Sequence, residues 1–349
     1  MADDTTAPRT VLVTGASTFL GGYLVARLAA NPAIERVLAV DSRVPRKDLI
    51  RRMGRAEFLR LDIRRPTIAK AIATYDVDTV VHAATSIMDT APHSAAIKEF
   101  NVVGAMQVCA AAQRSPSVKR LILRSTAMVY GASAHDPSHF DEGTPARREP
   151  KRGYGRDLLD IEGYARGLAR RRTDMDVTIV RAQAILGPRI STRMSSYLSL
   201  PIVPTVIGYQ PRLQFLHEED ALAAMEHVVL GSRPGTFNIA GEGVMTLTQA
   251  IRRIGHLELP VPSGLLAPIT GVLQDLKAAK LRSSQTEFLT YGRVLDTTRM
   301  RAELGFAPRY TTTETLDDFV ARGGVTPIIG AQTWRAVERR VVAAAHQLQ

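Results

Sequence analysis

The sequence is poor in several features that would point to particular classes of protein. It contains one cysteine, one tryptophan and only 5% aromatic residues in 349 positions. The lone Cys109 excludes a disulfide within the chain, and its apolar helical surroundings predict a buried thiol. No apolar run approaches the length of a membrane span, and the first residues, Met1 to Thr6, are polar. We therefore expect a cytoplasmic protein without a secretory signal.

Positive charge is in excess but is not concentrated. Lys and Arg number 45 against 34 Asp and Glu, a net charge of +11, which would suit nucleic acid or an anionic membrane as partner. The excess is mostly arginine, scattered in short runs such as Arg170-Arg171-Arg172, without the interleaved aromatics of a base-stacking surface. This distribution favours solvated helix faces, so we expect no specific nucleic-acid partner.

What the sequence does contain is a regular alternation of strand and helix patterns. Nearly continuous apolar runs predict strands at 9–14, 37–40, 57–61, 79–82, 120–123 and 177–180. Helical patterns lie between them, among them 19–30, 92–114 and 154–172. Strands that are apolar throughout are typical of a parallel sheet covered on both faces. The predicted fold class is therefore α/β, a doubly wound parallel sheet of the Rossmann type that binds ligands at its carboxyl edge.

The second half of the chain predicts a smaller, mostly C-terminal substrate lobe beside this sheet. Prolines and glycines interrupt the pattern after the sixth strand, and strand periodicity then returns. We expect a sheet domain of the Rossmann type over 1–182, to which 213–240 returns, and a lobe assembled from 183–212 and 241–330. Residues 331–349 predict a C-terminal helix with valines on one side and arginines on the other. A docked helix or dimer element is the favoured interpretation, and peripheral contact with an anionic membrane is the weaker one.

The first strand is followed by a turn that is typical of nucleotide binding. The stretch from Thr14 to Gly22 lies between a strand and a helix, an arrangement that brings backbone N–H groups and a helix N-terminus to a pyrophosphate. Asp41 ends the second strand twenty residues after Gly21, where its carboxylate can accept hydrogen bonds from both adenosine ribose hydroxyls. Together these features predict a dinucleotide site.

These residues belong to a series of motifs through which the chain resembles the extended short-chain dehydrogenases/reductases of the NAD-dependent epimerase/dehydratase type. The matches, spread over about 9–320, are Thr14 to Gly21, Asp62-Ile63, His82-Ala83-Ala84, Asn101, Ser125 to Gly131, Tyr154, Gly187-Pro188, Phe215 to Asp220 and Leu304 to Pro308. The resemblance implies NAD as cofactor, held by Gly15, Ser17, Thr18, Phe19, Leu20, Asp41, Ser42, Arg43, Asp62, Ile63, Ala83, Ala84, Asn101 and Tyr154. It also implies a small-molecule substrate and a homodimer.

Three residues of the predicted nucleotide site leave alternatives open. Asp41 favours NAD over NADP, because a carboxylate repels a phosphate on the ribose 2′ oxygen. Arg43, two residues further on, would weaken that preference if it faced the ribose, and is otherwise one more exposed arginine. Thr18 stands where the family usually has glycine, so we expect its Cβ to restrict the approach of the pyrophosphate unless the turn opens.

The predicted catalytic site lacks one of the three members that the family uses. By resemblance, Tyr154 is the general acid/base and Thr126 orients the reacting oxygen, whereas Leu158 replaces the lysine one helical turn after the tyrosine. The hydroxyl of a free tyrosine has a pKa of about 10, so base catalysis at neutral pH needs a nearby positive charge. Leu158 cannot supply that charge, although the cationic nicotinamide would supply part of it. The sequence therefore leaves open whether the chain is an active enzyme.

The substrate lobe also departs from the family pattern. Nucleotide-sugar members usually carry an asparagine where this chain has Ala184, and an arginine where it has Leu213, with Arg212 displaced by one position. A sugar nucleotide is therefore disfavoured as substrate. Apolar stretches at 197–204 and 264–273 predict either ordinary packing of the lobe or a pocket for a hydrophobic substrate.

The segment 217–220 contains residue types that occur in metal sites. His217, Glu218 and Asp220 are residue types that bind metal ions, but they stand at the start of a predicted helix. We expect them to fix that helix start, and we predict no metal site.

Two functions from different classes remain. The first is hydride transfer, with bound NAD, to or from a secondary alcohol or ketone of a sugar-like or hydrophobic substrate. The alternative is a catalytically degenerate NAD-binding protein that senses the cofactor or serves as a scaffold. Thr126 and Tyr154 favour the enzyme, whereas Leu158 and Ala184 favour the alternative. NAD recognition is common to both.

Overall fold

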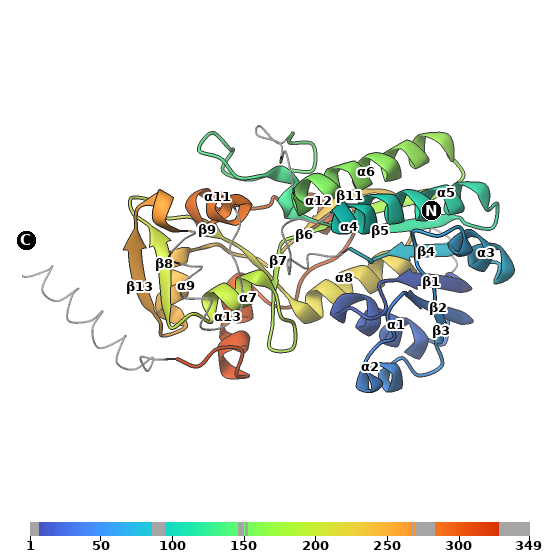
Figure 1. Cartoon of the computed structure of the whole chain (residues 1–349), viewed down its shortest axis with the longest axis horizontal. Helices are drawn as coiled ribbons and strands as arrows, with labels where there is room; N and C mark the ends of the chain where they lie inside the picture. The colour runs from blue at the N-terminus through green and yellow to red at the C-terminus, as the bar shows by residue number, and fades with distance from the viewer. Residues whose placement is uncertain are drawn as a thin grey trace, which may run out of the picture.

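The computed structural model describes residues 7–85, 95–145, 150, 153–266, 269 and 283–327. Its main strands are β1 Thr10–Thr14, β2 Arg36–Asp41, β3 Glu57–Arg60, β4 Thr79–His82, β5 Arg120–Thr126, β6 Asp176–Ala182 and β11 Gly235–Ile239. They form one seven-stranded sheet in the order β11-β6-β5-β4-β1-β2-β3, in which every neighbouring pair is parallel (Figure 1). The innermost strands are buried along their whole length, as their apolar sequences require. The predicted doubly wound parallel sheet is confirmed.

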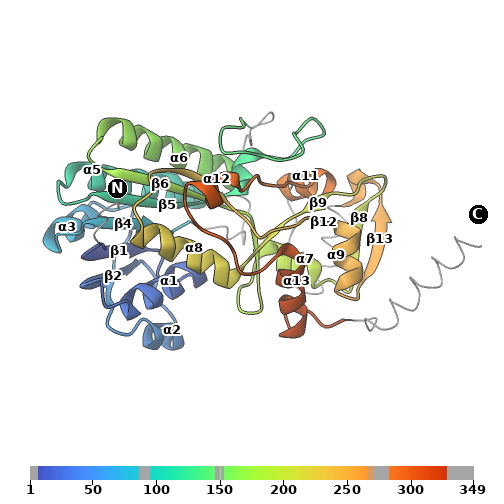
Figure 2. The same ribbon diagram turned by 180° about the vertical axis from the view of Figure 1, so that it is seen from behind.

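Helices cover both faces of this sheet (Figures 1 and 2). One face packs against α1 Phe19–Ala30, α2 Lys47–Arg52 and α8 Glu218–Leu230. The other packs against α3 Thr67–Thr74, α5 Gly104–Arg114 and α6 Tyr154–Arg171. The described part of the helix predicted at 92–114 is divided, because α4 Ala95–Lys98 is followed by the π-helical turn η1 Glu99–Val103 before α5 begins. A 3-10 turn, η2 Ala127–Tyr130, follows β5.

The strand order reverses between β1 and β4. From β1 the chain runs through β2 to β3 on one side, then returns to β4 and continues through β5 and β6 on the other. The connections that follow β1 and β4 therefore diverge, which leaves a crevice at the carboxyl ends of these two strands, where open α/β sheets bind ligands. The turn at Gly15 and the residues Ala83 and Ala84 lie at this edge.

A second lobe has its own apolar core. It contains three two-stranded sheets, which pair β7 Ala184–Leu186 with β10 Phe215–His217, β8 Ile202–Val206 with β13 Leu257–Val261, and β9 Arg212–Leu213 with β12 Met245–Thr246. The helices are α7 Arg193–Leu198, α9 Leu247–Arg253, the 3-10 turn η3 Ser263–Leu265, α11 Ser283–Tyr291 and α13 Thr312–Ala321. Tyr197, Leu198, Leu200 and Val203 are buried in this core. Lobe packing therefore accounts for much of the apolar stretch 197–204, whereas most of 264–273 lies outside the described residues.

The boundary between sheet domain and lobe differs in detail from the prediction. Residues 213–217 do not join the main sheet, because β9 pairs with β12 and β10 pairs with β7. The return to the main sheet begins with α8 and β11, and α12 Thr298–Ala302 also packs there through Met300. The helix predicted at 331–349 lies outside the described residues. In the described part of the chain, no helix is long and apolar enough to cross a membrane.

A buried ion pair ties α6 to the sheet. Arg181 on β6 donates to both carboxylate oxygens of Glu162 on α6, at 3.0 and 2.7 Å, and Ser125 Oγ on β5 donates to the same carboxylate at 2.6 Å. Burial acts to raise the pKa of Glu162, but the hydrogen bonds and charge of Arg181 outweigh it, so the pKa lies below its usual value. The pair fixes α6, which begins at Tyr154, against β5 and β6.

We expect Glu162→Gln to lower the free energy of unfolding by about 3 kcal/mol at pH 7, because it leaves buried Arg181 without its counter-charge. The matched control is Arg166→Gln, which removes a half-exposed partner of the same carboxylate and should cost less than about 1 kcal/mol. Urea unfolding measures both values.

The same pair predicts a pH dependence. Because the folded-state pKa of Glu162 is lowered, its stabilisation is present above the reference value of 4.5 and is lost as the pH falls below it. Wild type should therefore lose more stability than Glu162→Gln when urea unfolding is repeated below that pH. Two results would contradict the proposed role of the ion pair. One is an equal loss of unfolding free energy in Glu162→Gln and Arg166→Gln at pH 7, and the other is an equal loss of stability in wild type and Glu162→Gln below pH 4.5.

Candidate functional site

The turn after β1 is built on two close backbone contacts. Gly15 has a φ of +78°, and a Cβ there would lie 2.8 Å from Ala84 Cα. A Cβ on Gly21 would lie 2.2 Å from the carbonyl oxygen of Gly15. Both positions therefore require glycine, and the turn folds tightly between the end of β4 and the start of α1. The first N–H groups of α1, including those of Phe19 and Leu20, have no carbonyl one turn earlier in the helix and are suited to an anion.

Thr18 is the N-cap of α1. Its backbone angles, φ −83° and ψ 163°, are ordinary for any residue, so this position does not require glycine. Its Oγ1 accepts a hydrogen bond from Gly21 N–H at 3.1 Å and donates to the Gly15 carbonyl at 2.7 Å. The turn accommodates Thr18 by using its hydroxyl as a cap, while its effect on an approaching pyrophosphate stays a prediction.

Asp41 holds the turn from the end of β2. Its Oδ2 accepts hydrogen bonds from Ser17 N–H at 2.9 Å and Ser17 Oγ at 2.7 Å, and its Oδ1 accepts from Arg43 N–H at 3.0 Å. Carboxylate oxygens have room for further donors, so Asp41 can also receive hydroxyl groups. Ser42 is half-buried beside it, and the Arg43 side chain is exposed.

The other predicted cofactor residues lie along the same edge. Asp62 follows β3, and a hydrogen bond from Arg64 at 2.7 Å lowers the pKa of its carboxyl. Ile63 is buried against Gly104, where any side chain would collide with it. Asn101, in η1, donates from Nδ2 to Asp157 on α6 at 3.0 Å. Asn101 therefore links η1 to the helix that carries Tyr154, while buried Ala83 and Ala84 follow β4.

Tyr154 meets the nucleotide turn at the end of β4. Its side chain is buried, and its hydroxyl shares a hydrogen bond of 2.8 Å with Thr85 Oγ1. Thr85 directly follows Ala84, the residue against which Gly15 packs. The predicted nucleotide turn and the predicted catalytic tyrosine are therefore joined through two consecutive residues of one chain segment.

Thr126 lies near the same helix turn. Its Oγ1 accepts a hydrogen bond from Met128 N–H at 3.2 Å and caps η2. A Cβ on Gly155 would lie 2.8 Å from the Met128 carbonyl oxygen, so glycine allows the first turn of α6 to pack closely on η2. The structure thus brings Thr126 and Tyr154 to one edge, without a direct hydrogen bond between them among the described contacts.

Leu158 is part of the apolar core. Its side chain has no exposed surface and packs in the cluster beneath α6. The position at which the resemblance led us to expect a lysine is therefore filled by an aliphatic side chain, which supplies no charge to Tyr154.

Sequence analysis missed two partners of Tyr154. Besides Thr85, the Nη2 of Arg124 on β5 donates to Tyr154 Oη at 3.4 Å. A usable signal was present for Arg124, because this arginine directly follows the apolar run Leu121-Ile122-Leu123 in a strand predicted to be buried. For Thr85 there was none, since a threonine after a buried strand is unremarkable in sequence.

His82 completes the buried polar group at this edge. Its Nδ1 lies 3.0 Å from Thr14 Oγ1, which also accepts from Ala84 N–H at 3.2 Å. Burial, and secondly the charge of Arg124, lower the pKa of His82 to about 4, so its ring is neutral at pH 7. Its Nε2 has no hydrogen-bond partner in the described part of the chain.

The two lobe positions at which the resemblance led us to expect an asparagine and an arginine carry Ala184 and Leu213 in this chain. Leu213 is fully buried in the lobe core, and Ala184 is half-buried on β7. Arg212 is exposed and donates to the Ser138 carbonyl at 2.8 Å. A small cavity of about 150 Å³ is lined by residues of the segment 133–140, by Arg212 and by residues 291–294, which include Arg293.

Of the three residues predicted to fix the start of α8, His217 caps the helix, whereas Glu218 and Asp220 bind other segments of the chain. His217 is the N-cap of α8 and accepts from Glu219 N–H at 3.2 Å. Glu218 binds Arg189 at 2.7 Å, and Asp220 accepts from two backbone N–H groups, those of Arg309 and Tyr310. Among the described residues, no group of three or more His, Cys, Asp or Glu side chains is arranged to hold a metal ion.

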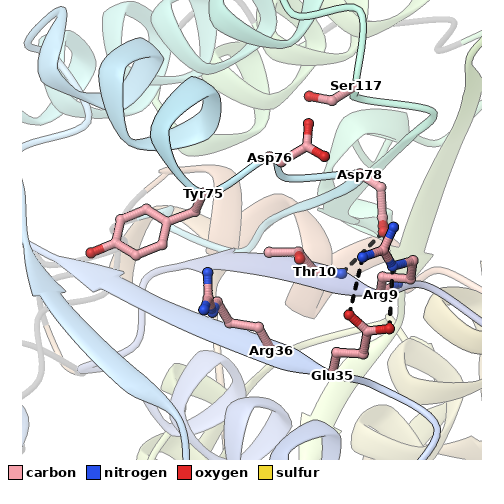
Figure 3. Close-up of a pocket in the computed structure, with 8 residues that line it drawn as sticks. All are labelled: Arg9, Thr10, Glu35, Arg36, Tyr75, Asp76, Asp78 and Ser117. Atoms are coloured by element: carbon pink, nitrogen blue, oxygen red, sulfur yellow. Dashed lines mark hydrogen bonds and ion pairs between the residues drawn. The ribbon is translucent and has the colours of Figure 1, made fainter.

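A larger cavity, of about 500 Å³, lies at the amino ends of β1, β2 and β4, and Figure 3 shows the residues that line it. It is lined by Arg9, Thr10, Glu35, Arg36, Tyr75, Asp76, Asp78 and Ser117. Arg9 pairs with Glu35 at 3.2 Å, and Asp78 accepts from the backbone N–H groups of Arg9 and Thr10. These groups largely satisfy one another, and the amino ends of parallel strands are not where this fold class binds ligands.

The contact between Gly15 and Ala84 can be tested by a pair of glycine substitutions. Gly54 also has a positive φ, of +57°, but nothing lies within 4 Å of its missing Cβ. Gly54→Ala should therefore cost only the left-handed backbone penalty, about 1 kcal/mol. Gly15→Ala should cost about 1–3 kcal/mol more, because its Cβ meets backbone atoms that cannot move aside. Equal losses in urea unfolding would show that the turn does not depend on this contact.

Comparisons with known proteins agree with this architecture. The model of the NAD dependent epimerase/dehydratase family matches residues 11–240. A protein of Mycobacterium tuberculosis, described as uncharacterized, is 51% identical over 341 residues, 97% of this chain and 91% of its own length. A Sinorhizobium fredii protein, also described as uncharacterized, is 26% identical over 264 residues, 70% of this chain and 71% of its own length.

Solved structures share the same fold. The UDP-glucose 4-epimerase of Thermotoga maritima, with UDP-glucose, has a TM-score of 0.68 at 18% identity and covers 90% of this chain and 98% of its own. A dTDP-glucose 4,6-dehydratase of Streptomyces venezuelae, with NAD and TYD bound, has a TM-score of 0.68 at 23% identity and covers 90% and 96%. With its Rossmann sheet, glycine turn and matched family model, the chain belongs to the NAD-dependent epimerase/dehydratase family.

Proposed function

We propose that this chain binds NAD at the carboxyl edge of the main sheet. The turn from Gly15 to Gly21 would receive the pyrophosphate, because its glycines leave the backbone accessible and the N-terminus of α1 follows it. Asp41 would accept the adenosine ribose hydroxyls with the capacity that its bonds to Ser17 and Arg43 leave. Asp62 and Ile63 would flank the adenine. The residues present therefore fit a dinucleotide.

The reaction we propose is hydride transfer to or from a secondary alcohol or ketone. Bound NAD would supply the hydride acceptor or donor. Tyr154 would exchange a proton between its Oη and the substrate oxygen, and Thr126 would orient that oxygen through its hydroxyl proton. The Thr126 hydroxyl is free to donate in this way, because its bond with Met128 uses it only as an acceptor.

One observation carries this proposal. Tyr154 Oη lies in a buried polar group with Thr85 and Arg124, and Thr85 follows directly on the residue that packs against Gly15. Burying the guanidinium of Arg124 costs free energy. If Tyr154 served only to pack the core, its hydroxyl would not require this charge beside it.

The substrate we propose is sugar-like or hydrophobic, and not a nucleotide sugar. Burial of Leu213 in the lobe core, and the engagement of Arg212 with Ser138, support the absence of the arginine that would bind a nucleotide diphosphate. The alternative, a degenerate NAD-binding scaffold, is not favoured, because the buried polar group around Tyr154 has no role in it. That alternative becomes one outcome of the following experiment.

Calorimetric titration with NAD and NADP, followed by a spectroscopic screen of alcohols and ketones for NAD reduction, tests the proposal. We expect NAD to bind about tenfold more tightly than NADP, since the carboxylate of Asp41 repels a 2′-phosphate. Binding of neither cofactor would refute the proposal. Tight NAD binding without turnover on any candidate would instead support the scaffold.

Tyr154→Phe should lower kcat by at least about 100-fold and leave the Kd for NAD within about threefold, because only the proton-transfer group is removed. Tyr164→Phe is the matched control, since Tyr164 lies on the same helix with an exposed side chain. Unchanged turnover in Tyr154→Phe would exclude Tyr154 as the acid/base.

A further inference from the structure

Arg124 is an unusual residue for the inside of a parallel sheet. It lies on β5, only 9% of its surface is exposed, and its neighbours Leu123 and Ile122 are buried apolar side chains. Its Nη2 donates to Tyr154 Oη at 3.4 Å, whereas its Nε is buried and has no hydrogen-bond partner among the described residues. A guanidinium is charged at every pH that a folded protein meets, so this edge carries a permanent positive charge.

The guanidinium of Arg124 lies beside the same hydroxyl that a lysine at position 158 was expected to contact. Leu158 stands one helical turn after Tyr154 but is fully buried in apolar core, so α6 presents no cation there. Arg124 reaches the same hydroxyl from β5. The tyrosine therefore has a cationic neighbour that comes from the sheet instead of from its own helix.

The other ionisable groups nearby do not supply this charge. His82, on β4, is neutral at pH 7 because burial and Arg124 lower its pKa to about 4. Asp157, on α6 itself, is a buried carboxyl group that accepts from Asn101. Glu162, further along α6, is already paired with Arg181. Among these described groups, Arg124 is the cation that contacts the Tyr154 hydroxyl.

We propose that Arg124 is the positioning residue that stabilises the ionised hydroxyl of Tyr154, in place of a lysine on α6. This inference rests on the proposed function. In the oxidative direction, the substrate carbon would give its hydride to bound NAD, and the substrate hydroxyl would give its proton to Tyr154 Oη as the carbon–oxygen double bond forms. The guanidinium stabilises the negative charge on Oη before that proton arrives, and Thr85 holds the same oxygen by its hydrogen bond.

The test compares Arg124→Gln with Arg124→Lys. Loss of the charge in Arg124→Gln should displace the acid limb of the pH profile of kcat to higher pH by about one unit or more. Arg124→Lys keeps the charge, and its limb should stay within about half a unit of wild type. Arg120→Gln is the control, because this arginine lies at the other end of β5 and binds the Val229 carbonyl. If the acid limb of the pH profile of Arg124→Gln lies at the same pH as in wild type, the proposal is overturned.

A second measurement does not depend on turnover. The ultraviolet absorbance of tyrosinate is titrated in each variant and in the same variant with Tyr154→Phe, so that the difference reports Tyr154 alone. We expect ionisation at higher pH in Arg124→Gln than in wild type, and an unchanged titration would overturn the proposal. If circular dichroism shows that Arg124→Gln does not fold, Arg124→Lys is used in its place. A displacement of the Tyr154 titration by one pH unit or more in Arg124→Lys would also overturn the proposal, because this variant keeps the positive charge.

The two proposals fail in different ways. If wild type neither binds NAD nor oxidises any alcohol, the proposed function fails, while the titration of Tyr154 still decides on Arg124. If wild type is active and Arg124→Gln keeps its pH profile, the function stands and the role of Arg124 is lost.

Discussion

The close approach of Gly15 to Ala84 organises the candidate site. No side chain fits between the turn after β1 and the end of β4, so the two segments meet backbone to backbone. The next residue along, Thr85, holds the hydroxyl of Tyr154. One steric constraint thus connects the turn that suits a pyrophosphate with the tyrosine that suits proton transfer. The ion pair between Glu162 and Arg181 fixes the other side, because it holds α6 against the sheet.

The charge distribution around Tyr154 follows from this packing. An aliphatic side chain fills the core position one turn along α6, which strengthens the contact of that helix with the sheet but removes a cation. A cation from β5 approaches the same hydroxyl from the sheet side. The same charge, together with burial, keeps His82 neutral. A buried arginine from the sheet therefore contributes a positive charge beside the Tyr154 hydroxyl, which the residues of α6 alone do not describe.

Much of the fold could be predicted because its signals are local. Apolar runs predict β1 and β4, and the glycines and Asp41 predict the nucleotide turn, since each depends on neighbouring residues or on a short, regular spacing. The lobe boundary was less predictable, because β9 and β10 contain only two and three residues and pair within the lobe. The periodicity of 213–217 indicates a strand, but in strands this short it does not show which strand is the partner.

The sequence by itself determined the family, the doubly wound sheet and the type of residue at each position of the nucleotide turn. It also showed that the helix of Tyr154 lacks a lysine. Only the tertiary structure decided what surrounds the Tyr154 hydroxyl, because Arg124 and Thr85 lie 30 and 69 residues away from it in the chain. Contacts of this kind depend on which strands are neighbours and on which residues end them together. Local sequence patterns carry no record of that geometry. The sequence showed that the helix lacks a lysine and that an arginine ends an apolar run, but not that this arginine contacts the Tyr154 hydroxyl.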